Sequence, residues 1–193
     1  MNKRSFTLIE LLITVGLMSL ALALTAGVLG SVVRTDNKQK VLMHIQNSGD
    51  SALDVIEENI RKASGITCVE SSSGDWGYVP CSSSDATILE LHSESYGYKY
   101  IGRAESSVVC PNGTKNGYLY IVDSKTEYND SNGGDEIKLT NDSTSGGINI
   151  TDFDFAVYGD SSPTRVSVNI KVAEGCSVLQ QKEFDTLVTL LGS

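Results

Sequence analysis

A long apolar segment near the N-terminus constrains this chain more than any other feature. Between Phe6 and Val33 the sequence carries one charge, Glu10. A membrane-spanning helix needs about 20 apolar residues, whereas the apolar core of a secretory signal has about 7–15. The segment therefore predicts a single membrane-spanning helix, and a removable signal peptide is the weaker alternative. Basic residues lie on both sides of it, so charge counting does not orient the span. The short N-terminal tail and the cysteine-bearing remainder favour a cytoplasmic N-terminus.

Glu10 needs its own explanation, because an unpaired carboxylate deep in lipid is costly. The stretch TLIE, from Thr7 to Glu10, matches the capping box that closes a helix start reciprocally. A carboxylate in the first turn also complements the helix dipole, by about 0.3–1 kcal/mol. A cationic partner is the other explanation, and the free α-amine of a neighbouring copy that begins at Phe6 would be such a partner. That second explanation requires cleavage just before Phe6.

The residues KRSFTLIELLITV resemble the leader and N-terminal helix of type IV pilins and pseudopilins. The resemblance implies that a prepilin peptidase cuts between Ser5 and Phe6 and methylates the new amine of Phe6. It also implies that Glu10 pairs with the Phe6 amine of an adjacent subunit and so sets the register of assembly. Ser5 departs from the family, which usually has glycine before the cut. A small residue is kept, so cleavage is compatible; an engineered block or a diverged peptidase are the alternatives.

The helix is predicted to continue beyond the membrane. Gly27 and Gly30 are expected weak points, because an interior glycine costs about 1 kcal/mol relative to alanine; close helix packing is the alternative role. Gly65 is the predicted stop. Beyond the span, apolar residues recur at helical spacing and predict a stripe that seats a sheet: Val41, Ile45, Ala52, Ile56, Ile60 and Ala63.

After Gly65 the composition changes to short β-rich runs separated by turn signals. Asn112-Gly113 and Asn116-Gly117 are predicted turns, and Asn132-Gly133-Gly134 is predicted to lie in a polar loop. The predicted strands are Ala86–His92, Tyr96–Gly102, Gly117–Asp123, Ile148–Gly159, Thr164–Ala173 and Glu183–Leu191. A helix followed by strands indicates an α+β fold, here a long N-terminal helix on an antiparallel sheet, as in pilins. The predicted regions are a leader (1–5), a membrane or filament-core helix (6–34), an amphipathic helix half (35–64) and an extracytoplasmic β-rich domain (65–193).

The C-terminal runs ITDFDFAVYG, RVSVNIKV and FDTLVTLL are similar to minor pilins of the W type and to J-type minor pseudopilins. This second resemblance implies a low-copy subunit that primes or tips a filament. Two alternatives stay open: a major pilin of the filament shaft, and an uncleaved, single-span, surface-tethered binding module. The implied partners are other pilin subunits, prepilin peptidase, the inner-membrane assembly platform and, before assembly, membrane lipid. The implied location is the cytoplasmic membrane and then a filament at the cell surface.

Four cysteines lie beyond the membrane segment: Cys68, Cys81, Cys110 and Cys176. None forms a CxxC pair, so zinc and thioredoxin-like sites are disfavoured. An even number in an exported domain indicates two disulfides, for which three connectivities are possible. We favour Cys68–Cys81 and Cys110–Cys176; free thiols are the alternative.

The sequence offers little for catalysis, cofactors or nucleic acid. His44 and His92 stand alone, whereas catalysis needs a positioned partner. The loop from Asp123 to Glu136 is rich in oxygen ligands, but it lacks the EF-hand order, so no metal site is predicted. The formal net charge is −9, which disfavours phosphate attraction, and direct nucleic-acid binding is not expected. No cofactor is expected, and the prediction is a structural protein rather than an enzyme.

Overall fold

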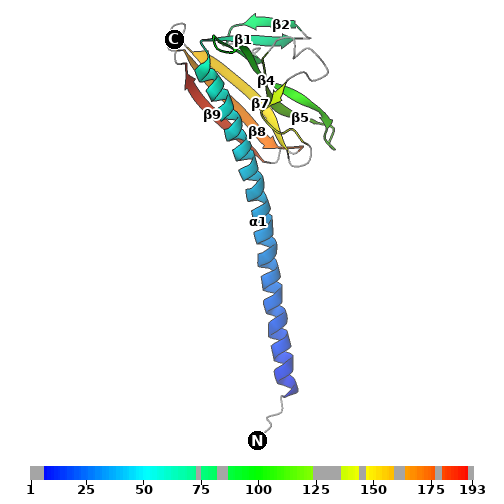
Figure 1. Cartoon of the computed structure of the whole chain (residues 1–193). Coiled ribbons are helices and arrows are strands. Elements are labelled where there is room, and N and C mark those ends of the chain that lie inside the picture. Colours follow the sequence, from blue (N-terminus) through cyan, green and yellow to red (C-terminus); the bar gives the residue numbers. More distant parts are fainter. Residues whose placement is uncertain are drawn as a thin grey trace. The chain divides into compact units, whose positions relative to one another are not determined.

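The structure is a computed structural model that describes residues 7–72, 75–81, 87–123, 136–143, 147–158, 164–176 and 180–190. Within them, one long helix is followed by nine strands, and every strand pairing is antiparallel (Figure 1). The chain forms two compact units, Met1–Leu42 and Met43–Ser193. The second unit contains the end of the helix together with all the strands. The predicted α+β fold is confirmed.

The helix α1 runs from Leu8 to Lys62. The predicted helix over residues 6–63 is therefore correct to within two residues at each end. The last turn carries two basic residues, Arg61 and Lys62, which favour the negative end of the helix dipole. Arg61 lies 3.3 Å from Glu57, one turn earlier, and Lys62 pairs with Glu58 in the same way. Gly65, predicted as the stop, is instead the first residue of a strand.

One stripe of α1 is buried in the second unit, and it is the stripe that helical spacing predicted. Val41, at the start of the predicted stripe, is half-buried. The buried helix residues are Ile45, Gly49, Ala52, Leu53, Ile56 and Ile60. Ala63, just beyond the helix, is also buried. The stripe therefore contains two members that apolar spacing did not include, Gly49 and Leu53.

Gly49 is buried because it faces an aromatic ring. A Cβ at this position would lie 2.5 Å from Cζ of Phe184 in the last strand. Two further contacts join the same helix segment to β9 and to the turn between β3 and β4: Thr186 Oγ1 donates to Glu57, and the Tyr96 hydroxyl donates to the Asn59 carbonyl at 3.1 Å. These contacts hold the amphipathic part of α1 on the β-rich domain.

The larger sheet has six strands in the order β2-β1-β3-β4-β5-β6. Their bounds are β1 Gly65–Ser72, β2 Asp75–Val79, β3 Ile88–Ser93, β4 Gly97–Val109, β5 Lys115–Val122 and β6 Ile137–Lys138. Three of the six, β3, β4 and β5, correspond to predicted strands. β1, β2 and β6 were not predicted; the serine-rich composition around β1 and β2 is typical of loops.

The smaller sheet is a meander of β7 (Ile148–Tyr158), β8 (Arg165–Glu174) and β9 (Gln181–Thr189). All three were predicted as β-rich runs between turn signals, and β8 also shows an alternation of apolar and polar side chains. On β8, the apolar residues Val166, Val168, Ile170 and Val172 are fully buried. This confirms the one-sided burial that the sequence predicted for this strand.

Two disulfides brace the β-rich domain. Cys68 is joined to Cys81, thirteen residues away, and Cys110 is joined to Cys176, sixty-six residues away. These are the two pairs favoured in the sequence analysis. The second links the end of β4 to the segment between β8 and β9, so it joins the two sheets.

The predicted turn at Asn116-Gly117 is wrong, because both residues lie inside β5. Only Asn112-Gly113 behaves as a turn, with a positive φ of 82° at Gly113 and a bond from its N–H to the Cys110 carbonyl. A Cβ on Gly117 would lie 2.1 Å from the Ile150 carbonyl oxygen. Glycine is therefore required there by the close approach of β7 and not by a turn. The predicted loop at Asn132-Gly133-Gly134 lies outside the described residues.

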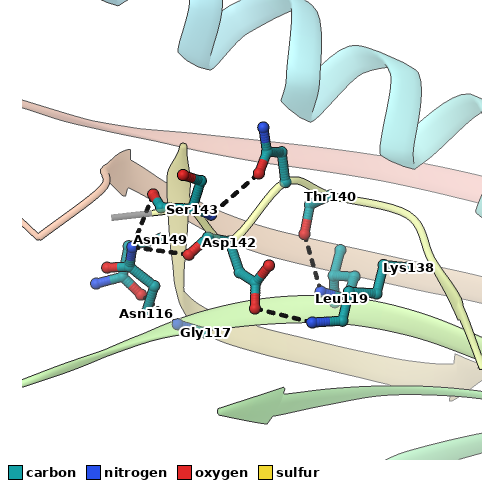
Figure 2. Close-up of polar contacts among 9 residues, drawn as sticks. Asn116, Gly117, Leu119, Lys138, Thr140, Asp142, Ser143 and Asn149 are labelled. Carbon is teal, nitrogen blue, oxygen red and sulfur yellow. Dashed lines mark hydrogen bonds and ion pairs between the residues drawn. The ribbon is translucent and has the colours of Figure 1, made fainter. Parts of the chain in front are cut away.

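Asn116 is buried, and hydrogen bonds of its side-chain amide join β5 to two other segments of the chain. Its Nδ2 donates to the carbonyls of Asp142 and Ser143, at 3.2 and 3.3 Å, and its Oδ1 accepts from the Cys176 N–H at 2.8 Å. Figure 2 shows how the segment between β6 and β7 folds back over β5 through this side chain. The start of β7 is joined to β5 through Asn149, whose Oδ1 accepts from the Gly117 N–H at 2.7 Å. A buried amide with its polar atoms satisfied specifies this connection.

A second anchor of the same segment is Thr140, whose hydroxyl accepts the Leu119 N–H at 3.0 Å (Figure 2). Asp142 carries an ion pair with Lys138 at 2.9 Å. Burial raises the pKa of Asp142, but hydrogen bonds from Lys138 and Ser106 outweigh burial, so its pKa lies below the ordinary value. The carboxylate is therefore held in its ionised form.

Candidate assembly site on the N-terminal helix

The first part of α1 has an apolar surface without a cover. Every large apolar side chain between Leu8 and Val33 is more than half exposed, from 83% at Leu8 to 55% at Ile13 and Val33. Among the described residues, α1 is the one helix long and apolar enough to cross a membrane. Contiguous exposed apolar surface of this extent marks a site that contacts lipid or other apolar helices.

Hydroxyl groups on this surface are satisfied within the helix. Thr14, Ser19, Thr25 and Ser31 each donate to a carbonyl three or four residues earlier, at 2.7–3.1 Å. In lipid there is no water to bond a hydroxyl or a backbone group, so such internal bonds are what a spanning helix requires. The polar residues of the segment are therefore compatible with an apolar environment.

Glu10 lies in the first turn, and it is exposed. The Thr7 carbonyl accepts the N–H groups of Glu10 and Leu11, at 3.1 and 3.3 Å. The Thr7 hydroxyl lies 3.4 Å from Oε2 of Glu10, which is a long contact. A capping box would instead join each side chain to the other residue's N–H. The predicted reciprocal capping box is therefore replaced by a weak contact between the two side chains.

Ser5 and Phe6, the predicted cleavage and methylation positions, lie outside the described residues. Gly27 and Gly30 lie within an unbroken α-helix. A Cβ at either glycine would meet no atom within 4 Å. Their predicted role as points of flexibility stays a prediction.

The boundary after the apolar surface is polar. Arg34, Asp36, Lys38 and Lys40 follow Val33, and Lys40 pairs with Asp36 at 2.6 Å along the helix. Both partners are largely exposed, so this pair contributes little to stability. Charges at this point set the limit of the surface that lipid can cover.

The segment that carries the exposed apolar surface of α1 overlaps a known sequence motif. The prokaryotic N-terminal methylation motif matches residues 1–26. The chain fits the type IV pilin and pseudopilin family. The motif ends inside α1, so the match does not include any residue of the β-rich domain. No curated protein and no solved structure matches the chain.

The methylation motif supports a type IV pilin or pseudopilin precursor. It implies processing by prepilin peptidase and assembly with other pilin subunits. The long apolar helix is consistent with anchoring in a membrane before assembly. The motif points to a structural subunit rather than an enzyme.

The two histidines occupy unrelated places. His44 is exposed on α1. His92, in β3, lies 4.7 Å from the Tyr98 ring between centroids, and its Nδ1 lies 3.4 Å from the Ser64 hydroxyl, which also donates to the His92 carbonyl. Within the described ranges, no group of three or more histidine, cysteine or acidic side chains is arranged to hold a metal ion. Most of the acidic loop between Asp123 and Glu136 lies outside those ranges.

Sequence reasoning missed two polar residues that the fold buries, Asn116 and Glu90. Asn116 is 1% exposed and Glu90 is 3% exposed. For Glu90 a signal existed, because this charged residue stands between Leu89 and Leu91 in β3. A charge inside such a strand indicates a special environment. For Asn116, the following glycine suggested a turn and concealed the burial.

Proposed function

We propose that the chain is a subunit of a type IV filament, stored in the cytoplasmic membrane and then packed into the filament core. One observation carries this proposal: the methylation motif continues into a helix surface on which every large apolar side chain is exposed. Lipid can cover that surface before assembly, and the corresponding helices of other subunits can cover it afterwards. The segment 6–34 serves as the core helix, 35–64 as the seat of the domain, and 65–193 as the extracytoplasmic part.

In this proposal prepilin peptidase cuts between Ser5 and Phe6 and methylates the Phe6 amine, which stays cationic. Glu10 then pairs with that amine on a neighbouring subunit. An unpaired charge in an apolar bundle costs several kcal/mol, so one register between helices is favoured over others. The inner-membrane assembly platform extracts the subunit from the membrane. The chain itself catalyses no reaction; it is a substrate of the peptidase.

The finer proposal is a minor subunit that primes or tips the filament. It rests on the similarity of the C-terminal runs, which form β7, β8 and β9, to W-type minor pilins and J-type minor pseudopilins. Two disulfides suit a domain in an oxidising compartment outside the cytoplasm. The ratio of this chain to other pilins in sheared filaments tests the role: a low ratio supports a minor subunit, and an excess of this chain identifies the shaft protein.

The mass of the N-terminal peptide, measured on protein from its own cells, tests the processing. We expect a chain that begins with methylated Phe6, which would establish cleavage after Ser5. A chain that begins at Met1 would contradict the proposal and would favour the uncleaved, surface-tethered module. In that case Glu10 would keep only its contact at the helix start.

The assembly role of Glu10 is tested by Glu10→Ala, with Thr7→Ala as the matched control. Glu10→Ala removes the carboxylate, whereas Thr7→Ala removes only the local hydroxyl that contacts it. We expect Glu10→Ala to leave the subunit in the membrane and to lower its amount in sheared filaments by about tenfold or more. Thr7→Ala should assemble normally. Equal defects in both variants would assign Glu10 to the helix start and reject the intersubunit pair.

A further inference from the structure

One face of the six-stranded sheet gathers tyrosines around a buried carboxylate. Glu90 of β3 lies directly opposite Thr67 of β1 and Tyr100 of β4. Side chains in register across neighbouring strands share a face, and so do residues two positions away. Tyr98 lies two residues from Tyr100 and therefore points to the same side. Tyr78 joins this face from the edge strand β2, through its pairing with Val69.

The carboxylate of Glu90 is only partly satisfied. The side chain is 3% exposed, and its Oε2 has no hydrogen-bond partner among the described residues. Tyr78 and Tyr100 both hydrogen-bond to Glu90. A buried carboxylate that lacks a partner on one oxygen is costly, and a donor that reached this oxygen would relieve the cost.

The pKa values of Tyr78 and Tyr100 are both raised, and Glu90 contributes to both shifts. The charge of Glu90 is the largest cause that raises the pKa of Tyr78, ahead of burial and of Tyr98. Burial is the largest cause for Tyr100, followed by Glu90. No basic group contributes to either shift. Among the described residues, the causes that raise these two pKa values are therefore burial, Glu90 and other tyrosines.

Two of the three tyrosines are open to solvent. Tyr78 is 65% exposed and Tyr98 is 50% exposed, whereas Tyr100 is 6% exposed. Aromatic faces attract organic cations, and phenol oxygens accept hydrogen bonds from them. A divalent metal fits less well, because calcium takes six to eight oxygen ligands and this cluster has one carboxylate. The chemistry favours an organic cation that carries N–H donors.

We propose that Glu90, Tyr78 and Tyr98 bind a protonated primary amine, whose N–H donates to Oε2 of Glu90 while the two exposed tyrosines flank the cation. A rotation of the exposed Tyr78 side chain on its edge strand breaks its hydrogen bond to Glu90 and opens the path to the carboxylate, and the amine then replaces that donor. The amine is either a lysine side chain of another protein or a free alkylamine. This site goes beyond filament assembly, and it does not depend on cleavage before Phe6.

The test uses the full chain in detergent micelles and follows the tyrosine ring resonances by NMR. The probes are n-propylammonium, Nα-acetyl-lysine methylamide and tetramethylammonium, each at matched ionic strength. We expect saturable shifts of Tyr78 and Tyr98 with both primary amines, and no saturable shift of Tyr158, an exposed tyrosine of the smaller sheet. Binding of acetyl-lysine methylamide identifies a protein lysine as an acceptable source, whereas binding of propylammonium alone identifies a free amine.

Tetramethylammonium has no N–H group and therefore separates a hydrogen bond from attraction by the aromatic rings alone. We expect it to bind about tenfold more weakly or worse than n-propylammonium. Equal affinity for both cations would overturn the proposed bond to Glu90. The absence of any saturable shift with the primary amines would overturn the site.

Variants assign the binding to its residues. Glu90→Gln keeps the side-chain shape and should weaken amine binding by about tenfold or more. Glu94→Gln makes the same change of charge at an exposed position close by and should bind as the native chain does. If Glu90→Gln does not fold, Tyr98→Leu, at an exposed position, should still weaken binding severalfold. Unchanged affinity in a folded Glu90→Gln or in Tyr98→Leu would reject the site.

Discussion

The two parts of α1 differ in where their apolar residues find a partner. Between Leu8 and Val33 the apolar residues surround the helix, and all the large ones are exposed. Between Ile45 and Ile60 they form one stripe, and the stripe is buried on the strands of its own unit. An apolar surface on all sides requires an environment outside the chain, whereas a stripe requires one sheet face. The same helix thus packs one part on its own domain and leaves the other exposed.

The largest expected effect comes from truncating one apolar side chain in each part. Ile56 is fully buried and Leu22 is 70% exposed. Ile56→Ala should lower the free energy of unfolding of the β-rich domain by about 2–5 kcal/mol. Leu22→Ala should change it by less than about 0.5 kcal/mol. Denaturant unfolding of the full chain in micelles, followed by near-ultraviolet circular dichroism, measures both; similar losses would break the comparison.

The glycines of the two parts should respond with opposite signs. At Gly49 a Cβ meets the Phe184 ring, so Gly49→Ala adds about 1–3 kcal/mol of overpacking, which exceeds the helix-propensity gain of about 1 kcal/mol. The melting temperature of the domain should therefore fall. At Gly27 the space is open. Gly27→Ala should slow amide hydrogen exchange around residue 27 by about fivefold, because helix propensity is then the main change.

A stabilising Gly49→Ala would show that the Phe184 ring moves aside without cost and would weaken the comparison. Faster exchange in Gly27→Ala would show that this glycine has a packing role that alanine cannot fill. The exchange rates of Gly27→Ala also test the predicted flexibility at Gly27.

The smallest expected effect concerns polar contacts. Thr186→Val removes the hydroxyl that donates to Glu57 and keeps the shape of the side chain, so it should cost about 0.5–1.5 kcal/mol. Asp36→Asn breaks an ion pair whose two side chains are 71% and 53% exposed, and should cost less than about 0.5 kcal/mol. The same denaturant unfolding measures both variants. A larger loss for Asp36→Asn than for Thr186→Val would contradict the assignment of the buried stripe as the stabilising contact.

Local patterns predicted those elements whose stabilising contacts have a regular period. The helical stripe from Ile45 to Ile60 and the alternation along β8 follow from the 3.6 and 2.0 periods of the backbone. β1 and β2 were not predicted, since their serine-rich composition resembles that of loops and their stability comes from pairing with each other and with β3. The local sequence of a strand does not show which distant segment will pair with it.

The candidate sites divide in the same way. The assembly surface on α1 was predictable, since it consists of consecutive residues. The tyrosine cluster around Glu90 was not, because register across β2, β1, β3 and β4 brings its members together. Gly117 shows the same limit, because the close approach of Ile150 from β7 decides its role.

The sequence by itself determined the membrane-facing helix, the α+β order of elements and the methylation motif, because each depends on composition, on a short motif or on a period along the chain. The tertiary structure decided which side chains the β-rich domain buries against one another. It paired Gly49 with Phe184, folded the segment after β6 over Asn116, and left Oε2 of Glu90 buried without a partner among the described residues. These features arise from contacts between residues far apart in sequence, and packing and hydrogen-bond satisfaction select them only when the whole domain is formed.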